Sequence, residues 1–70
     1  MANPFQISLA AARVNANLTQ AEAAEKLGVD KNTIGRWESG KVIPRTPQLL
    51  AMAHIYGVSI DNLYLPEKLT

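Results

Sequence analysis

The chain has 70 residues, of which 47% are hydrophobic, a formal net charge of +1 and no cysteine. It is long enough for a single domain over residues 1–70 and too short for two, and without cysteine it can hold neither disulfides nor thiolate metal sites. Its apolar runs are too short to cross a membrane and its N-terminus lacks the regions of a signal peptide, so we expect a cytoplasmic protein.

Five stretches of the chain begin at a helix-capping residue and end at glycine, at asparagine or before a proline. Abundant alanine and few aromatic residues also favour short, closely packed helices over a sheet. We therefore expect an all-α protein, a bundle of five helices without strands. The helices are expected over about residues 4–16, 20–27, 31–39, 46–56 and 59–65, followed by a C-terminal tail over residues 66–70.

Two of these helices are expected to start with a capping residue followed by proline, whose fixed φ suits the first helical turn. The pairs are Asn3 with Pro4 and Thr46 with Pro47. The first helix is expected to close at Asn17, because asparagine is one of the few non-glycine residues that tolerate the left-handed conformation.

Only three residues, Gly28 to Asp30, separate the second helix from the third, so the two helices must cross sharply. Thr19 and Glu22 form a capping box at the start of the second helix, and Asp30 caps the third. Gly28 supplies the positive φ that the turn needs. Ala24 lies where the two helices approach most closely, and a larger side chain there would push them apart.

The third helix has two chemically different faces. Ile34 and Trp37 share one face and are expected to fill the core together with Leu18, Leu27 and Val29. The opposite face then carries Lys31, Asn32, Gly35, Arg36 and Ser39. In a DNA major groove, asparagine pairs with adenine, and arginine or lysine pairs with guanine. This helix is therefore expected to read the base edges of double-stranded DNA.

Positive charge continues beyond the third helix. Residues 31–45 hold Lys31, Arg36, Lys41 and Arg45 against one acid, Glu38. Such a strip gives affinity for phosphates without carrying sequence information. The small net charge of the whole chain is weak support for a nucleic-acid partner, however, and the same cations could form a solvated face.

From about Leu9 to Leu63 the chain resembles the phage repressor and Cro family of helix-turn-helix domains, also called xenobiotic-response-element-like regulators. The resemblance is carried by LTQAEAAEKLGV (residues 18–29), NTIGRWESGK (residues 32–41), Pro44 and GVSIDNL (residues 57–63). It implies a compact five-helix bundle of the lambda-repressor-like type with a helix-turn-helix unit over residues 20–39. It also implies that the third helix lies in the major groove of a DNA operator.

The resemblance also implies roles for individual side chains. Positions that read bases in the family are matched by Lys31, Asn32 and Arg36. Positions near the DNA phosphates are matched by Gln20, Ser39, Lys41 and Arg45, and Thr33 matches one that touches phosphate or base. Arg13 and Glu38 match a pair that forms a salt bridge between the first and third helices of the family.

The chain departs from the family where Ala12 and Ala23 replace the usual leucine, so larger residues must rebuild the core. The residues expected to do this are Phe5, Trp37, Met52 and Tyr56.

Gly35 is a further candidate contact in the middle of the third helix, where glycine costs roughly 1 kcal/mol relative to alanine. Two interpretations are open. The missing side chain lets the helix lie close to a base or a thymine methyl, or the glycine is a tolerated imperfection.

No pattern indicates an enzyme. His54 is the single histidine, and no serine or threonine stands in a pattern with it that would make an activated nucleophile. A glycine-rich phosphate loop is also absent. We therefore expect no catalytic activity, metal, cofactor or small-molecule ligand.

The leading hypothesis is a sequence-specific transcriptional regulator, a repressor of phage, plasmid or bacterial type. One module of this size makes few base contacts, so we expect a homodimer on a palindromic operator with half-sites about 34 Å apart. The expected dimer surface is the C-terminal region, with Leu63, Tyr64 and Leu65. The alternative is an antitoxin-like or other protein-interaction module that keeps the fold but has little DNA activity.

Overall fold

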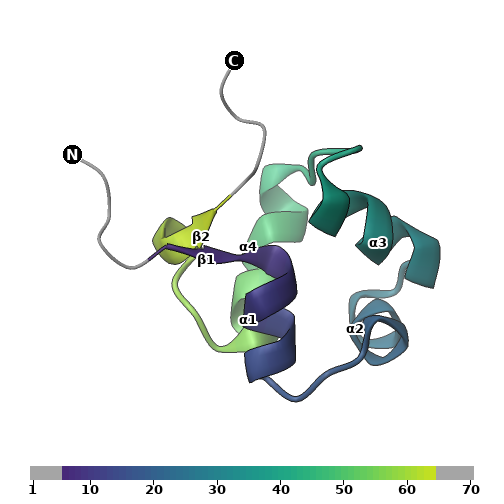
Figure 1. The fold of residues 1–70 in the computed structure, drawn as a ribbon, viewed down its shortest axis with the longest axis horizontal. Helices are drawn as coiled ribbons and strands as arrows, with labels where there is room; N and C mark the ends of the chain where they lie inside the picture. Colours follow the sequence, from purple (N-terminus) through teal and green to yellow (C-terminus); the bar gives the residue numbers. More distant parts are fainter. Residues whose placement is uncertain (1–5, 65–70) are drawn as a thin grey trace.

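The computed structural model describes residues 6–64, and these are mostly helical (Figure 1). The elements in chain order are β1 (Ile7–Ser8), α1 (Leu9–Asn15), α2 (Gln20–Leu27), α3 (Lys31–Ser39), α4 (Thr46–Tyr56), the 3₁₀ turn η1 (Ile60–Asn62) and β2 (Leu63–Tyr64). The helical class and the bounds of the three central helices agree with expectation. The count of five helices is not confirmed, since the described residues form four α-helices and one 3₁₀ turn. No described helix is long and apolar enough to cross a membrane.

The N-terminal helix starts later than expected. The Ser8 backbone is extended, with φ −69° and ψ 160°, and the Ala11 N–H donates to the Ser8 hydroxyl oxygen at 3.0 Å, so Ser8 is the N-cap of α1. The expected helix over residues 4–16 is therefore wrong for Gln6, which is not helical, and for Ile7 and Ser8, which form β1. Asn17 has a φ of +63°, as its position after the helix predicts. The expected caps at residues 3 and 4, and the expected core residue at position 5, lie outside the described residues.

The expected fifth helix is wrong beyond its first turn. Ser59 caps η1, because the Asp61 N–H donates to the Ser59 hydroxyl oxygen at 3.2 Å. The chain then becomes extended, and β2 pairs in parallel with β1 through Ile7 opposite Leu63. The expectation that the chain has no strand is wrong for a physical reason, because a two-residue strand is too short to show an alternating pattern. Residues 65–70, including the expected tail, lie outside the described residues.

Local capping explains the central helices. Thr19 and Glu22 form the expected capping box: the Glu22 N–H donates to Thr19 Oγ1 at 3.0 Å, and the Thr19 N–H donates to Glu22 Oε1 at 2.8 Å, both measured from nitrogen to oxygen. At the start of α3 the Asn32 N–H donates to the Asp30 carboxylate at 2.9 Å. At α4 the N-cap is Arg45 rather than the expected Thr46, because the Arg45 N–H donates to the side-chain oxygen of Gln48 at 2.8 Å. The proline at position 47 still lies in the first turn.

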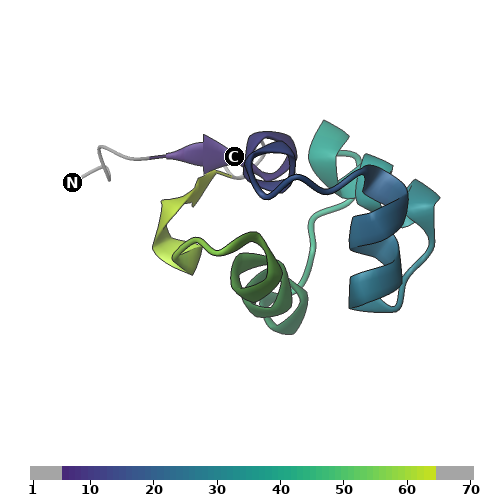
Figure 2. The same ribbon diagram turned by 90° about the horizontal axis from the view of Figure 1, so that it is seen from below.

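The core lies where the four α-helices meet, and Figure 2 shows α2 and α3 together on one side of it. Leu9, Ile34 and Met52 are fully buried, and Trp37 and Tyr56 are almost so. These include three of the residues expected to rebuild the core. Leu18, Leu27 and Val29 pack against the core while partly exposed, as expected. Ala12 and Ala23 are 0% exposed, so their small side chains let the helices approach closely.

Tyr56 brings a polar group into this core. Its hydroxyl oxygen is buried and has no hydrogen-bond partner among residues 6–64. Burial, reinforced by the nearby Glu38 carboxylate, raises the pKa of Tyr56 to about 12, while the Arg13 guanidinium opposes that rise.

We expect the free energy of unfolding to fall as the pH rises from about 10 to about 12. The unfolded tyrosine loses its proton near pH 10.0, whereas the folded one keeps it to about 12, so alkaline solution favours the unfolded chain over this range. Urea unfolding measured across this pH range gives the dependence.

Tyr56→Phe should remove this alkaline loss and change stability by less than about 1 kcal/mol at neutral pH, since the hydroxyl has no partner to lose. Tyr64→Phe is the matched control, because Tyr64 is 46% exposed, and it should leave the loss in place. An undiminished loss in Tyr56→Phe would assign the pH dependence to other groups.

Candidate nucleic-acid interface

Helices α2 and α3 are joined by a closed three-residue turn. Gly28 has a φ of +71°, and the Val29 N–H donates to the Ala24 carbonyl oxygen at 3.0 Å. Ala24 is only 3% exposed, as expected for a residue at the closest approach of the two helices. The turn therefore fixes α3 against α2, with Ile34 and Trp37 turned into the core and the opposite face turned outward.

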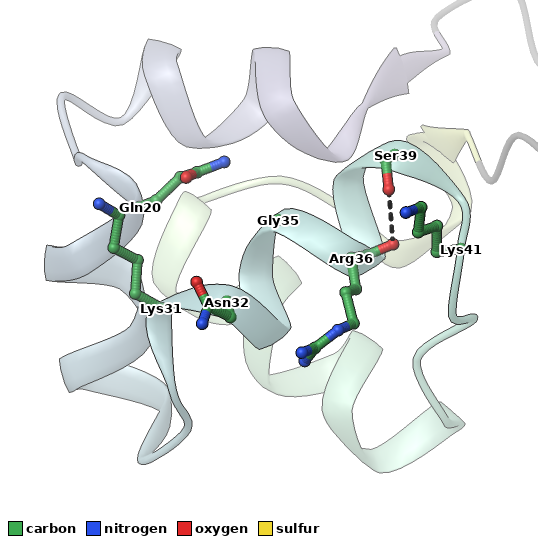
Figure 3. Close-up of a pocket in the computed structure, with 7 residues that line it drawn as sticks. All are labelled: Gln20, Lys31, Asn32, Gly35, Arg36, Ser39 and Lys41. Atoms are coloured by element: carbon green, nitrogen blue, oxygen red, sulfur yellow. Dashed lines mark hydrogen bonds between the residues drawn. The ribbon is translucent and has the colours of Figure 1, made fainter.

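A shallow hollow of about 410 Å³ lies over the outer face of α3 (Figure 3). It is lined by Gln20, Lys31, Asn32, Gly35, Arg36, Ser39 and Lys41. The hollow thus brings together seven of the nine residues expected from the sequence. Three of the lining residues are cations and none is an acid, so the hollow attracts anionic groups.

The two remaining candidates lie outside the hollow. Thr33 is half-buried on α3, and Arg45 is exposed at the N-cap of α4. No group of three or more histidine, cysteine, aspartate or glutamate side chains that could hold a metal occurs within residues 6–64.

The polar side chains of the hollow differ in whether they already form a hydrogen bond. The Asp30 carboxylate accepts a hydrogen bond from the backbone N–H of Asn32, while the Asn32 side chain is exposed in the hollow. The Ser39 hydroxyl donates to the Arg36 carbonyl oxygen at 3.2 Å, drawn as the dashed line in Figure 3. Ser39 must therefore give up this bond before its hydroxyl can donate to a phosphate.

The salt bridge expected between Arg13 and Glu38 is present. Arg13 Nε lies 2.6 Å from Glu38 Oε2 and Arg13 Nη2 lies 3.3 Å from Glu38 Oε1, a two-point contact. The two side chains are 13% and 8% exposed. The hydrogen bond to Glu38 raises the pKa of the Arg13 guanidinium against the opposing effect of burial. Arg13 Nη1 also donates to the Leu18 carbonyl oxygen at 2.8 Å, which ties down the chain before α2.

The structure adds a contact that the sequence did not predict. Gln20 Nε2 donates to Glu38 Oε1 at 3.0 Å, so the first side chain of α2 is held by the last turn of α3. Gln20 was expected only near a phosphate. The signal for this second role is tertiary, because the two residues are 18 positions apart and meet only after α2 and α3 have crossed.

Glu38→Ala should lower the free energy of unfolding by about 3 kcal/mol, because it leaves the largely buried Arg13 guanidinium without its carboxylate. Urea unfolding at neutral pH measures the loss. Glu25→Ala is the matched control, since Glu25 is an exposed carboxylate on α2, and it should change stability by no more than about 0.5 kcal/mol. Equal effects of the two substitutions would show that the Glu38 contacts contribute little to stability.

Comparison with known proteins gives a match to one family model. Residues 9–63 match the model described as helix-turn-helix. The chain is 38% identical over 65 residues to the HTH-type transcriptional activator BcrR of Enterococcus faecalis, an alignment that covers 93% of this chain and 32% of BcrR. No solved structure gives a significant match.

Two other relatives carry similar names. The HTH-type transcriptional regulator ImmR of Bacillus subtilis (strain 168) is 42% identical over 52 residues, which cover 74% of this chain and 41% of ImmR. The uncharacterized HTH-type transcriptional regulator MJ0272 of Methanocaldococcus jannaschii is 39% identical over 51 residues, which cover 73% of this chain and 77% of that protein. The chain thus spans less than half the length of BcrR and of ImmR.

Proposed function

The chain belongs to the helix-turn-helix family of the phage repressor and Cro type, and we propose that it regulates transcription by binding a specific duplex DNA sequence through α3. The observation that best supports this is the hollow over α3, which brings two amides and three cations together on one outward surface. Lys31, Asn32 and Arg36 are the proposed base-reading residues, because their side chains match the hydrogen-bonding groups that bases show in a major groove.

The residues proposed to contact the DNA phosphates surround these base-reading residues. They are Gln20 at the start of α2, Thr33 on α3, Ser39 at the end of α3, and Lys41 and Arg45 in the following loop. Cations placed beside a groove neutralise phosphates and release counterions, which gives affinity for any sequence. Gln20 also lies at a helix N-terminus, where backbone N–H groups favour an anion.

The proposed complex is a homodimer on a palindromic operator in the cytoplasm, with half-sites about 34 Å apart. One copy offers three base-reading side chains, too few for the affinity that specific sites usually show. The proposed dimer contact is the C-terminal region, where Tyr64 is 46% exposed and Leu63 is half-buried in β2. Repression is the proposed outcome, since a bound dimer would cover its operator, although the relative BcrR is named as an activator.

Selection from a random duplex library should enrich one palindromic site, bound by two copies. On that site Arg36→Ala should weaken binding by about 1–3 kcal/mol per half-site and relax the choice of base at one position.

Arg45→Ala should weaken binding to all sequences alike and reduce the slope of log K against log salt by about 0.9 for each phosphate that is no longer neutralised. Competition binding at several salt concentrations measures both effects.

Lys26→Ala is the matched control, because Lys26 is an exposed cation of α2 that does not line the hollow. It should bind the selected site as the parent does. If Arg36→Ala and Arg45→Ala also bound like the parent, the proposed recognition surface would be wrong. Failure to enrich any site would favour the protein-interaction module, whose apolar contacts should respond little to salt.

A further inference from the structure

Of the four glycines, Gly35 is the one whose backbone conformation does not require a glycine. Gly28, Gly40 and Gly57 end helices with φ values of +71°, +83° and +72°, which favour glycine strongly. Gly35 lies inside α3 and has no positive φ. A Cβ placed on it would meet only Gln20 Nε2, at 3.9 Å, which is ordinary van der Waals contact. An alanine would therefore fit at this position in the free protein.

Alanine would also stabilise α3, because glycine inside a helix leaves the unfolded chain more conformational freedom. The glycine thus lowers the stability of the free protein, and neither backbone conformation nor packing there requires it. Its position in the hollow suggests that the glycine serves binding instead. In Figure 3 Gly35 lies between Gln20 and Lys31 on one side and Arg36 and Ser39 on the other, within the lining of the hollow.

Gly35 differs from the rest of the hollow in chemistry as well as in size. Every other residue that lines the hollow ends in an amide, a hydroxyl or a cation. At Gly35 the surface is the bare helix backbone, recessed by one side chain relative to neighbours one turn away at Lys31 and Ser39. A small apolar group can lie there without displacing water from a charged head.

We propose that Gly35 is the seat for a pyrimidine 5-methyl group, an inference that rests on the proposed function and deepens it. The 5-methyl group of thymine is the apolar feature that base pairs present in the major groove. Gly35 lies with Asn32 and Arg36 in the lining of the hollow, so a base pair next to one that they read would face Gly35, where the missing side chain leaves room for the methyl. The same chemistry is offered by 5-methylcytosine.

The test pairs Gly35→Ala with operators that lack one methyl group. Each thymine of the selected operator is replaced in turn by deoxyuridine, which removes only the 5-methyl group. The parent should bind about fourfold less tightly per half-site when one particular thymine is replaced, the loss expected for one buried methyl. Gly35→Ala should bind the unmodified operator more weakly than the parent and should gain affinity on that replacement, because its Cβ occupies the seat.

Two controls separate this effect from folding. The melting temperature of Gly35→Ala should rise by about 4–8 °C, so weaker binding cannot come from unfolding. Val14→Ala is the matched variant, because Val14 is 58% exposed on α1 and its replacement also raises helix propensity away from the hollow. It should bind every operator as the parent does.

A second pair of duplexes carries cytosine or 5-methylcytosine at the sensitive position and identifies the source of the methyl group. Tighter binding of the parent to the methylated duplex, absent in Gly35→Ala, shows that either base can fill the seat. Equal binding of the parent to both duplexes restricts the seat to thymine.

The inference is overturned if Gly35→Ala binds the unmodified operator as tightly as the parent. It is also overturned if deoxyuridine costs both proteins the same at every position. A parent that selects no duplex at all would instead contradict the proposed function, and the 5-methyl seat would be rejected with it.

Discussion

The Glu38 carboxylate holds together the three helices on which the hollow depends. It lies on α3, receives two hydrogen bonds from Arg13 of α1, and receives a third from Gln20 of α2. Because Glu38 and Arg13 are largely buried, these bonds are screened little by water or salt. The Glu38 carboxylate therefore adds to the core packing of Ile34 and Trp37 in orienting α3, and through Gln20 it reaches the lining of the hollow.

Helix α3 serves the core and the surface with the same nine residues. Ile34 and Trp37 turn inward, whereas Lys31 and Arg36 are exposed on the outer face. Small residues elsewhere make this possible, since Ala23 and Ala24 of α2 are buried and let α3 approach closely. A site built on a packed helix in this way keeps its side chains in place better than one built on a loop. The proposed base-reading role would need such precision, because a bidentate hydrogen-bonded pair tolerates little displacement.

Helix caps depend on residues that are close in sequence, so the ends of the central helices could be predicted from the sequence. The bounds of α2 and α3 could be predicted because Thr19, Asp30 and the glycine at position 28 act on neighbours within four residues. Helical periodicity likewise predicted the five α3 residues that line the hollow, whereas Gln20 and Lys41 were expected from the family resemblance. The strands could not be predicted, since Ile7 and Leu63 meet only through the whole fold. The bond from Gln20 to the α3 carboxylate was missed for the same reason.

The parallel pairing of β1 with β2 has a consequence for the order in which the molecule assembles. Pairing residues 7 and 63 closes a loop over nearly the whole described chain, which costs more entropy than closing the short connection between α2 and α3. The contacts between α2 and α3 are close in sequence and form with little such cost. We therefore expect the strand pair to form after the contacts between α2 and α3. In both ribbon views it lies at the opposite end of the molecule from α2 and α3, so we expect that a local opening at this end would leave the helical surface folded (Figure 1, Figure 2).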